Sequence, residues 1–202
     1  MSDLVTTFIF FFAVIDPIGT IPVFIAATRK YSESERNKIA LKAVIVSAFV
    51  LIFFLVAGEF ILEALNIPLS AFQIAGGIVL FLFALSMIFG ESKPEEEIKM
   101  VGKASEIAIF PLAMPSIASP GAMLAAVLLT ENQKYNIWEQ VQTGLTMLSV
   151  LVIVLVAMFL ANKIHKVIGD SGASIISRVM GLILVSVAVS SILEGIKMYF
   201  AL

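Results

Sequence analysis

The stretch Asp16-Pro17-Ile18-Gly19-Thr20-Ile21-Pro22 lies in the middle of an otherwise apolar segment, Leu4–Thr28. This segment has the length of a membrane-spanning helix, which needs roughly 17–25 mostly apolar residues. Pro17 and Pro22 lack a backbone N–H and crowd the carbonyl four residues earlier, while Asp16, which precedes a proline, is pushed away from helical geometry. The sequence therefore predicts a broken helix, with the break roughly 18 Å along it at about 1.5 Å per residue.

The composition places the whole chain in the membrane class. Of its 202 residues, 60% are hydrophobic and only 14% are charged, and the mean hydropathy is +1.05, far from the balance of a soluble domain. A net charge of −2 argues against a nucleic-acid partner, which phosphate contacts would have to hold. The absence of cysteine excludes a disulfide framework and a cysteine metal site, and we expect no metal site. The lipid bilayer is the expected partner.

Six stretches with at most one charge each predict six transmembrane helices within a single domain, residues 1–202. They are Leu4–Thr28, Ala43–Gly58, Ala64–Gly90, Ile107–Thr130, Gln140–Asn162 and Val179–Leu193, the second and sixth lengthened by flanking residues. A transmembrane β-barrel would instead require segments of about ten residues with alternating hydrophobicity, which these continuous runs lack. The predicted fold class is therefore an all-α membrane protein.

The loop charges predict the orientation. Eleven of the 13 Lys and Arg residues fall in three segments, at 29–42, in a loop at about 91–106, and at 163–178. The opposite side of the membrane would carry only Lys134 and Lys197. Because basic short loops stay in the cytoplasm, we expect both termini outside a prokaryotic cytoplasmic (inner) membrane, with the 91–106 loop cytoplasmic.

A weak internal repeat relates the two halves of the chain. Pro115 and Pro120 are five residues apart, as Pro17 and Pro22 are, at a shift of 98. Residues 75–80 also resemble residues 179–184, at a shift of 104. Two units of three helices, about 1–92 and 104–202, would be inverted relative to each other, with helices one and four broken. Inverted repeats with broken helices are typical of secondary transporters, although prolines can also merely kink membrane helices.

Several motifs resemble the MarC family of membrane proteins. These are residues 16–24 and 110–115, then Ser119-Pro120-Gly121-Ala122, together with 75–78 and 178–184. The resemblance covers essentially the whole chain. It implies a six-helix prokaryotic inner-membrane protein of the broader group that includes the LysE amino-acid exporters. It also implies transport of small neutral amino acids such as glycine and alanine, a role described for some members.

Asp16 is the leading candidate for chemistry. A carboxylate at the centre of a membrane helix costs about 2.5–3.5 kcal/mol on insertion scales, so it is rarely placed there without a role. We expect Asp16 to bind the coupling ion, H+ or Na+, or the ammonium group of a small-molecule substrate. No other cofactor is expected. The alternative is a structural carboxylate that caps the N–H groups freed after Pro17.

The remaining candidates surround the two breaks or lie on other helices. The predicted substrate- or ion-binding residues besides Asp16 are Pro17, Gly19, Thr20, Pro22, Pro115, Ser116, Ser119, Pro120, Gly121, Gln73 and Arg178. Helix N-termini at the breaks would favour a carboxylate and freed carbonyls an ammonium group, and we expect the two breaks to face each other across a hydrated chamber near the bilayer centre. Arg178 is either a positive-inside anchor or a partner that turns toward Asp16. Gly76, Gly77 and Gly181 are expected to pack helices closely.

An enzyme is not expected, because only one carboxylate is deep in the membrane and no base accompanies Ser116 or Ser119. The sequence also has no P-loop for ATP. The predicted function is a secondary transporter of small neutral amino acids or similar small polar solutes, coupled through Asp16. An accessory or structural membrane protein, or a small-solute channel, remains as the alternative. The sequence leaves open whether the chain forms a homo-oligomer.

Overall fold

The computed structural model describes residues 4–89, 107–132 and 134–201, apart from the side chains at positions 165, 170 and 173. The predicted cytoplasmic loop at about 91–106 therefore lies outside the described residues. Within them, every regular element is helical. In chain order these elements are α1 (Leu4–Ile15), α2 (Pro17–Thr28), α3 (Glu33–Ala64), α4 (Leu69–Phe89), η1 (Ala108–Ile117), α6 (Pro120–Leu128), α7 (Ile137–Phe159) and α8 (Ala161–Tyr199).

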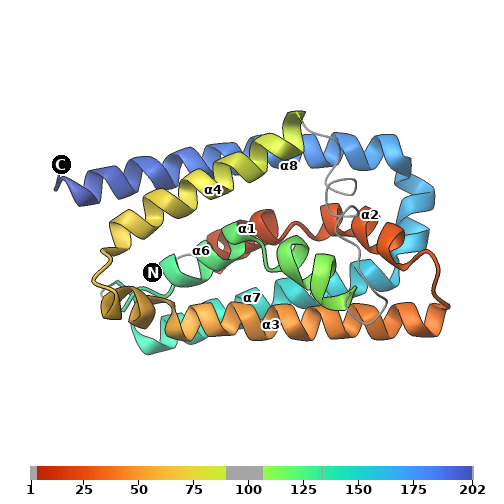
Figure 1. The fold of residues 1–202 in the computed structure, drawn as a ribbon, viewed down its shortest axis with the longest axis horizontal. Coiled ribbons are helices and arrows are strands. Elements are labelled where there is room, and N and C mark those ends of the chain that lie inside the picture. The colour runs from red at the N-terminus through yellow and green to blue at the C-terminus, as the bar shows by residue number, and fades with distance from the viewer. Residues whose placement is uncertain (1–3, 90–106, 133, 202) are drawn as a thin grey trace.

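The helices form three layers (Figure 1). Helices α4 and α8 lie side by side along one face of the bundle, and α3 and α7 pair along the opposite face. The shorter elements α1, α2, η1 and α6 lie between these two pairs; α1, α2 and α6 contact helices of both pairs, and η1 contacts α3 and α2. Both termini point toward the left-hand end of Figure 1. The interrupted elements are therefore central, enclosed by the longer helices.

The described helices include enough long apolar segments for five to six membrane spans. Five segments qualify directly, at Leu4–Thr28, Glu33–Ala64, Leu69–Phe89, Ile137–Phe159 and Ser174–Tyr199. The pair η1 and α6 makes a sixth if it is taken as one span, bent by 56°. The predicted all-α membrane fold is confirmed at this level.

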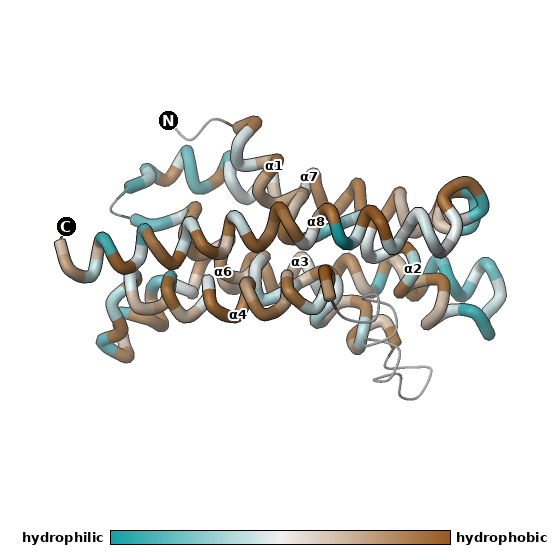
Figure 2. Tube along the Cα trace, turned by 90° about the horizontal axis from the view of Figure 1, so that it is seen from above, coloured by the Kyte–Doolittle hydropathy of each residue, from teal (hydrophilic) through white to brown (hydrophobic). Residues whose placement is uncertain are grey.

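Much of the apolar surface faces outward, as a bilayer requires. Along α3 the side chains of Phe49, Val56 and Phe60 are exposed by 73%, 66% and 69%. Hydrophobic residues line the lengths of the helices, while hydrophilic ones concentrate toward their ends (Figure 2). Such contiguous exposed apolar surface marks contact with a membrane or partner rather than with water.

Side-chain caps explain where two of the long helices begin. Ser32 precedes α3 and forms a reciprocal capping box with Glu35, while Asn136 and Glu139 do the same for α7. In a capping box each side chain accepts from an N–H that the first helical turn leaves unpaired.

The segment at 163–178, predicted to be a loop, is instead helical, as part of α8. Its one break is at Gly169, where φ is +65°, a conformation that costs glycine little.

The pairing of α4 with α8 depends on glycines. A Cβ on Gly77 would lie 3.1 Å from the carbonyl oxygen of Ala188, and one on Gly181 would lie 3.0 Å from that of Ala84. The predicted packing glycine Gly76 instead faces Leu124 of α6. Gly77 and Gly181 thus let the two backbones approach, as small residues do between membrane helices.

Replacing Gly181 by leucine should therefore loosen the bundle. Overpacking of this kind costs about 1–3 kcal/mol, and each kcal/mol lowers the thermal midpoint of a chain of this size by roughly 2–4 °C. Gly144→Ala is the control, because a Cβ at Gly144 would meet only a Leu55 methyl at 3.4 Å. Thermal unfolding in detergent, followed by circular dichroism, tests this. Equal midpoints for the two variants would contradict the packing role.

Candidate functional site

The first helix break is at Asp16, between α1 and α2. Asp16 adopts a left-handed backbone conformation with φ 51° and ψ 70°, which aspartate tolerates better than most residues. Its Oδ1 accepts a hydrogen bond from the Gly19 N–H at 2.9 Å, and its carbonyl oxygen accepts one from the Thr20 hydroxyl at 3.0 Å. Asp16 is 1% exposed. A buried carboxylate thus caps the N-terminus of α2, where the helix dipole favours negative charge.

Gly19 leaves the space that the Asp16 carboxylate occupies. A Cβ at this position would overlap Oδ2 of Asp16, with the nearest carboxylate atoms inside van der Waals contact. Only glycine allows α2 to begin while the Asp16 side chain folds back over its first turn. Pro22, by contrast, lies inside α2 without ending the helix, so Pro17 marks the break and Pro22 does not.

The second break is longer and more irregular than the first. Within η1, Phe110 and Met114 are extended, with φ/ψ of −123°/123° and −132°/127°. Each precedes a proline, Pro111 or Pro115, and the residue before proline prefers this region. The helix resumes at Pro120, the first residue of α6, and the Ser119 side chain caps it by accepting from the Ala122 N–H at 3.2 Å.

Hydroxyl groups join the two breaks across the protein interior. Ser119 Oγ donates to the carbonyl oxygen of Val14, in the last turn of α1, at 2.8 Å. Ser116 Oγ donates to Thr20 Oγ1 at 3.4 Å. The residues Asp16, Thr20, Ser116 and Ser119, which we call the break cluster, thus come together from α1–α2 and η1–α6. Each break supplies polar partners for the other, as a backbone in lipid requires.

The break cluster is closed in this conformation. Thr20, Ser116 and Ser119 are 0% exposed and Asp16 is 1% exposed. The sequence led us to expect a hydrated chamber at this place, and that expectation is wrong for the described conformation around these four side chains. Because the Ser119 hydroxyl bonds the Val14 carbonyl of the opposite break directly, water is not needed to satisfy that carbonyl.

The prolines of the two breaks differ in their placement. The shift of 98 paired Pro17 with Pro115, but Pro115 lies within η1 whereas Pro17 opens a helix. Pro120, like Pro17, is the first residue of a helix, and Ser119 caps that helix as Asp16 caps α2. Both pairs are separated by 103 residues. This register nearly equals the shift of 104 that relates residues 75–80 to 179–184.

Other predicted site residues lie apart from the break cluster or only support it. Gln73 is buried in α4 and its Nε2 donates to Glu194 Oε2 in α8 at 3.3 Å. Arg178 is exposed on α8, and no ion pair in the described part of the chain joins it to buried Asp16. Gly121 packs α6 against α4, because a Cβ there would lie 2.6 Å from Leu80 Cδ1.

Sequence reasoning missed a third contributor, Ser47 in the middle of α3. Its hydroxyl bonds the carbonyl of Ala43 at 2.9 Å and reaches the carbonyl of Ala113, inside η1, at 3.4 Å. Ser47 is fully buried. A lone hydroxyl in the apolar stretch Ala43–Gly58 was the available signal, since such a group needs a partner within the protein.

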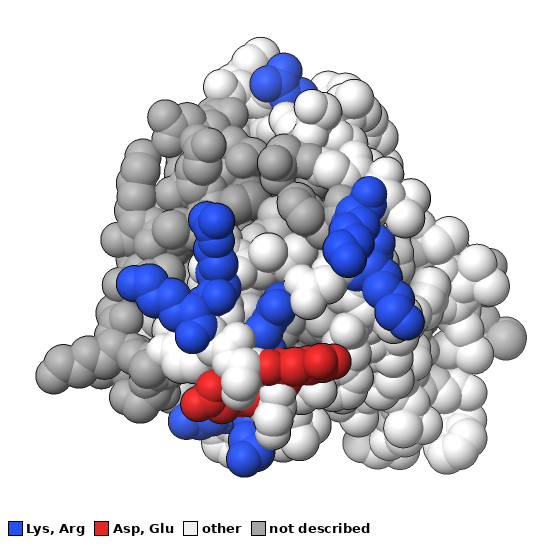
Figure 3. All heavy atoms as spheres, turned by 90° about the vertical axis from the view of Figure 1, so that its right-hand side faces the viewer, with Lys and Arg blue, Asp and Glu red and all other residues white. Residues whose placement is uncertain are grey.

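Basic residues gather at one end of the bundle. Figure 3 shows Lys and Arg side chains spread over the end where α2 joins α3 and α7 joins α8. Arg36 connects these elements, because its Nε donates to Thr28 Oγ1 and its Nη2 to Asn162 Oδ1, both at 3.1 Å. Its guanidinium also lies 5.5 Å from the ring centroid of Phe24, within cation–π range.

A family model and several relatives both describe membrane proteins. Residues 1–200 match the family described as MarC family integral membrane protein. A UPF0056 membrane protein of Methanocaldococcus jannaschii is 36% identical over 189 residues, 92% of each chain. A UPF0056 membrane protein of Aquifex aeolicus is 32% identical, covering 96% of this chain and 92% of its own. YvbG of Bacillus subtilis, also a UPF0056 membrane protein, is 33% identical, covering 98% and 96%. No solved structure matches the chain.

Ser119→Ala should weaken the junction between the breaks. It removes both the donor to the Val14 carbonyl and the acceptor for the Ala122 N–H, which together predict a loss of about 1–3 kcal/mol in stability. Ser149→Ala is the control, because exposed Ser149 bonds only the Thr146 carbonyl of its own helix. Thermal unfolding of both purified variants measures the difference. An unchanged midpoint for Ser119→Ala would mean that this bridge is not structural.

Proposed function

Because the chain belongs to the MarC family of integral membrane proteins, we propose that it is a secondary transporter with no catalytic reaction. Its proposed substrates are small neutral amino acids or similar small polar solutes. The observation that carries the proposal is the break cluster, where two interrupted spans meet around a buried carboxylate. Transporters commonly build their binding sites from discontinuous helices of this kind.

The helix ends at the breaks suit a zwitterionic solute. Helices α2 and α6 both begin at the breaks, and a helix N-terminus favours the carboxylate of a bound solute. The Asp16 carboxylate and the carbonyl of Val14 are acceptors that would suit its ammonium group. The candidate binding residues are accordingly those of the break cluster, with Pro17, Gly19, Pro115, Pro120 and Gly121 shaping the backbone around them.

We propose that Asp16 carries the ion coupling, by binding H+ or Na+ or by holding the substrate's ammonium group. The carboxylate is buried and lies where the first span is interrupted, and such groups in membranes are rarely without a role. In the described conformation its Oδ1 accepts from the Gly19 N–H. The closed cluster then represents an occluded state. The 3.4 Å bond from Ser116 to Thr20 is long enough to part at small cost when the site opens.

The two halves are proposed to be inverted repeats, about 1–92 and 104–202. The register of 103 residues supports this arrangement, because it relates two capped prolines that each open a helix. Helices that this register would make equivalent, α3 with α7 and α4 with α8, also pack against each other. Rocking of one repeat against the other would expose a site between them alternately to the two sides.

We propose that the basic end of the bundle faces the cytoplasm of a prokaryotic cell, with both termini outside. The concentration of Lys and Arg where α2 joins α3 and α7 joins α8 supports this orientation under the positive-inside rule. The first span would then enter the membrane from outside at Leu4 and reach the cytoplasm near Thr28. A homo-oligomer is compatible with this topology.

A structural or accessory membrane protein is the second candidate. The observation that favours it is the complete burial of the break cluster, because hydroxyls that only bridge two helices need no solute. A small-solute channel would use the same residues without coupling. A flux measurement on one variant and its control separates these functions.

Asp16→Asn should abolish gradient-driven uptake of glycine or alanine into liposomes, reducing the initial rate at least about tenfold, while the variant stays folded. The reason is that asparagine keeps the shape and the acceptor oxygen of the cap but cannot bind a proton or balance a cation. Glu33→Gln, at an exposed carboxylate in the first turn of α3, is the matched control and should transport normally.

Three results contradict the proposal in different ways. Undiminished, still gradient-coupled uptake by Asp16→Asn removes the coupling role. Uptake by the unmodified chain that ignores proton and sodium gradients indicates a channel. No flux of any amino acid under any gradient favours the structural candidate.

The topology predicts opposite labelling of two cysteines in this cysteine-free chain. Tyr199→Cys, at an exposed position near the C-terminal end of α8, should react with a membrane-impermeant maleimide added to intact cells. Ser34→Cys, in the exposed first turn of α3, should react only after the cells are opened. The reverse pattern would overturn the orientation.

A further inference from the structure

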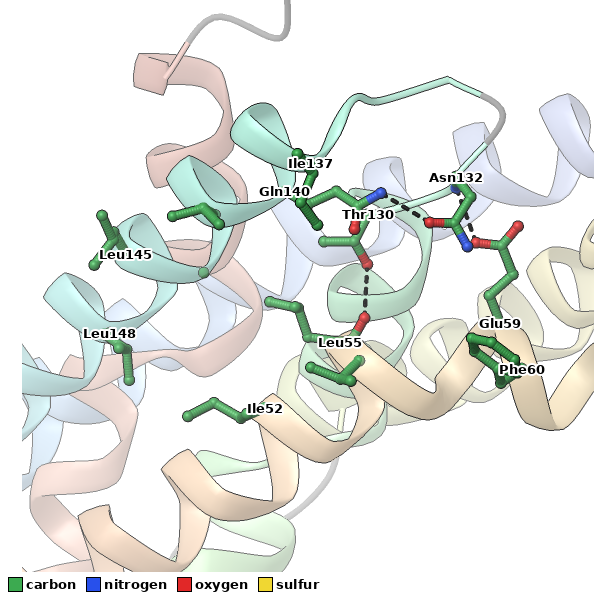
Figure 4. A pocket seen from close by; sticks show the side chains of 13 residues that line it. Ile52, Leu55, Glu59, Phe60, Thr130, Asn132, Ile137, Gln140, Leu145 and Leu148 are labelled. Atoms are coloured by element: carbon green, nitrogen blue, oxygen red, sulfur yellow. Dashed lines mark hydrogen bonds between the residues drawn. The ribbon is translucent and has the colours of Figure 1, made fainter.

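A groove lies between α3 and α7 at the end of the bundle that holds the termini (Figure 4). Its volume is about 450 Å³, within the range of about 300–1,000 Å³ usual for sites that hold small molecules. One wall comes from α3 and the other from α7, and the segment after α6 closes its polar end. The groove shares no residue with the break cluster.

The groove exists because α7 has a glycine where it faces α3. A Cβ on Gly144 would meet one atom within 4 Å, a Leu55 methyl at 3.4 Å. At most glycines on the other helices, a Cβ would instead clash with a neighbouring side chain. At Gly58, for example, it would lie 2.4 Å from a methyl group of Val127. Gly144 thus leaves a hollow in the helix interface that a larger residue would fill without a clash.

The walls of the groove are apolar and open sideways toward the hydrocarbon. On α3, Ile52 and Val56 are exposed by 41% and 66%, and on α7, Val141 and Leu145 by 45% and 60%. Both helices are candidate membrane spans. An occupant that enters from this direction is therefore a molecule dissolved in the bilayer, with an apolar chain to cover Gly144.

The end of the groove nearest the termini is polar. Glu59 Oε2 accepts from the Asn132 N–H at 2.8 Å, and Gln140 Nε2 donates to Asn132 Oδ1 at 2.9 Å. Thr130 Oγ1 bonds the Leu55 carbonyl at 3.2 Å. The bond from Asn132, which Gln140 holds in turn, keeps Glu59 beside the groove, as Figure 4 shows. Glu59 is five residues before the end of α3 at Ala64, roughly 7 Å along the helix at about 1.5 Å per residue, a depth suited to a lipid headgroup.

The charge at this end selects the headgroup. Glu59 is the charged residue among those that line the groove, and it also borders an adjoining pocket lined by Glu63 and Glu131. Lys134 offsets one of these charges through its ion pair with Glu131 at 2.7 Å. An anionic headgroup is therefore disfavoured. A primary ammonium group can donate up to three hydrogen bonds to carboxylates, which a quaternary ammonium group cannot do.

We propose that this groove binds a membrane lipid with a primary ammonium headgroup, of the phosphatidylethanolamine class. One acyl chain lies over Gly144 between α3 and α7, and the ammonium group donates to the Glu59 carboxylate. The site is independent of the proposed transport function, because it uses none of the residues assigned to transport.

The chain carries its own reporter for this site. Trp138 is its single tryptophan, it is 65% exposed, and it follows Ile137, which lines the groove. Lipids with brominated acyl chains quench tryptophan fluorescence on contact. The purified chain in phosphatidylcholine vesicles is titrated with brominated phosphatidylethanolamine, and in parallel with brominated phosphatidylcholine and brominated phosphatidylglycerol.

We expect half-maximal quenching at an about tenfold lower mole fraction of brominated phosphatidylethanolamine than of the other two lipids, the lower end of what one hydrogen bond to a charged group contributes. Glu59→Gln should remove this preference, and Gly144→Leu should remove it by filling the groove. Glu33→Gln and Val152→Leu, which change an exposed charge and an exposed α7 side chain outside the groove, should retain it.

Equal curves for the three lipids, or a preference for phosphatidylglycerol, overturn the proposal. So does a preference that survives Glu59→Gln, which is a mild change and keeps the test valid if Gly144→Leu does not fold. If Gly144→Leu instead changes the oligomeric state measured by light scattering while leaving quenching unaltered, the groove is an interface between copies of the chain and the lipid site is rejected.

Discussion

A backbone that leaves helical geometry inside a bilayer must find hydrogen-bond partners within the protein, and this requirement organises the whole molecule. The first break leaves the carbonyl of Val14 at the end of α1, and the Ser119 hydroxyl of the second break reaches it. Helix α3 contributes Ser47 to the carbonyl of Ala113 in η1. The long-helix pairs α3–α7 and α4–α8 enclose these bonds on two faces. The second break thus supplies a partner for the first, and α3 supplies one for the second.

The sequence predicted those features that follow from local chemistry. The apolar stretches predicted the spans, and the pair Asp16-Pro17 predicted a helix break, because proline has no N–H and constrains the residue before it. The sequence did not predict which proline of the second half opens a helix as Pro17 does, since residue spacing alone cannot distinguish such a proline from one inside an irregular segment. The positions of Ser47 and Glu194 also depend on packing between distant helices, and no local pattern reports that.

The closed break cluster is the largest difference from expectation. Buried polar groups normally satisfy each other, and hydroxyl side chains are short enough to do this without leaving room for water. Closure is also what a transporter needs between its two open states, because a site open to both sides would leak. In the proposed transport cycle, opening breaks the Ser116–Thr20 and Ser119–Val14 hydrogen bonds and replaces them with bonds to water or to a solute.

Access of water to the break cluster tests this account most directly. Ser116→Cys places a single thiol in the cluster of a chain that has no other cysteine. We predict that it reacts slowly with a small water-soluble thiosulfonate from each side of a sealed vesicle, and that glycine or alanine together with a proton or sodium gradient changes the rate at least about threefold. A thiol that stays unreactive from both sides under every gradient and solute, while Ser34→Cys labels readily, would contradict the claim that the two breaks form a site that opens.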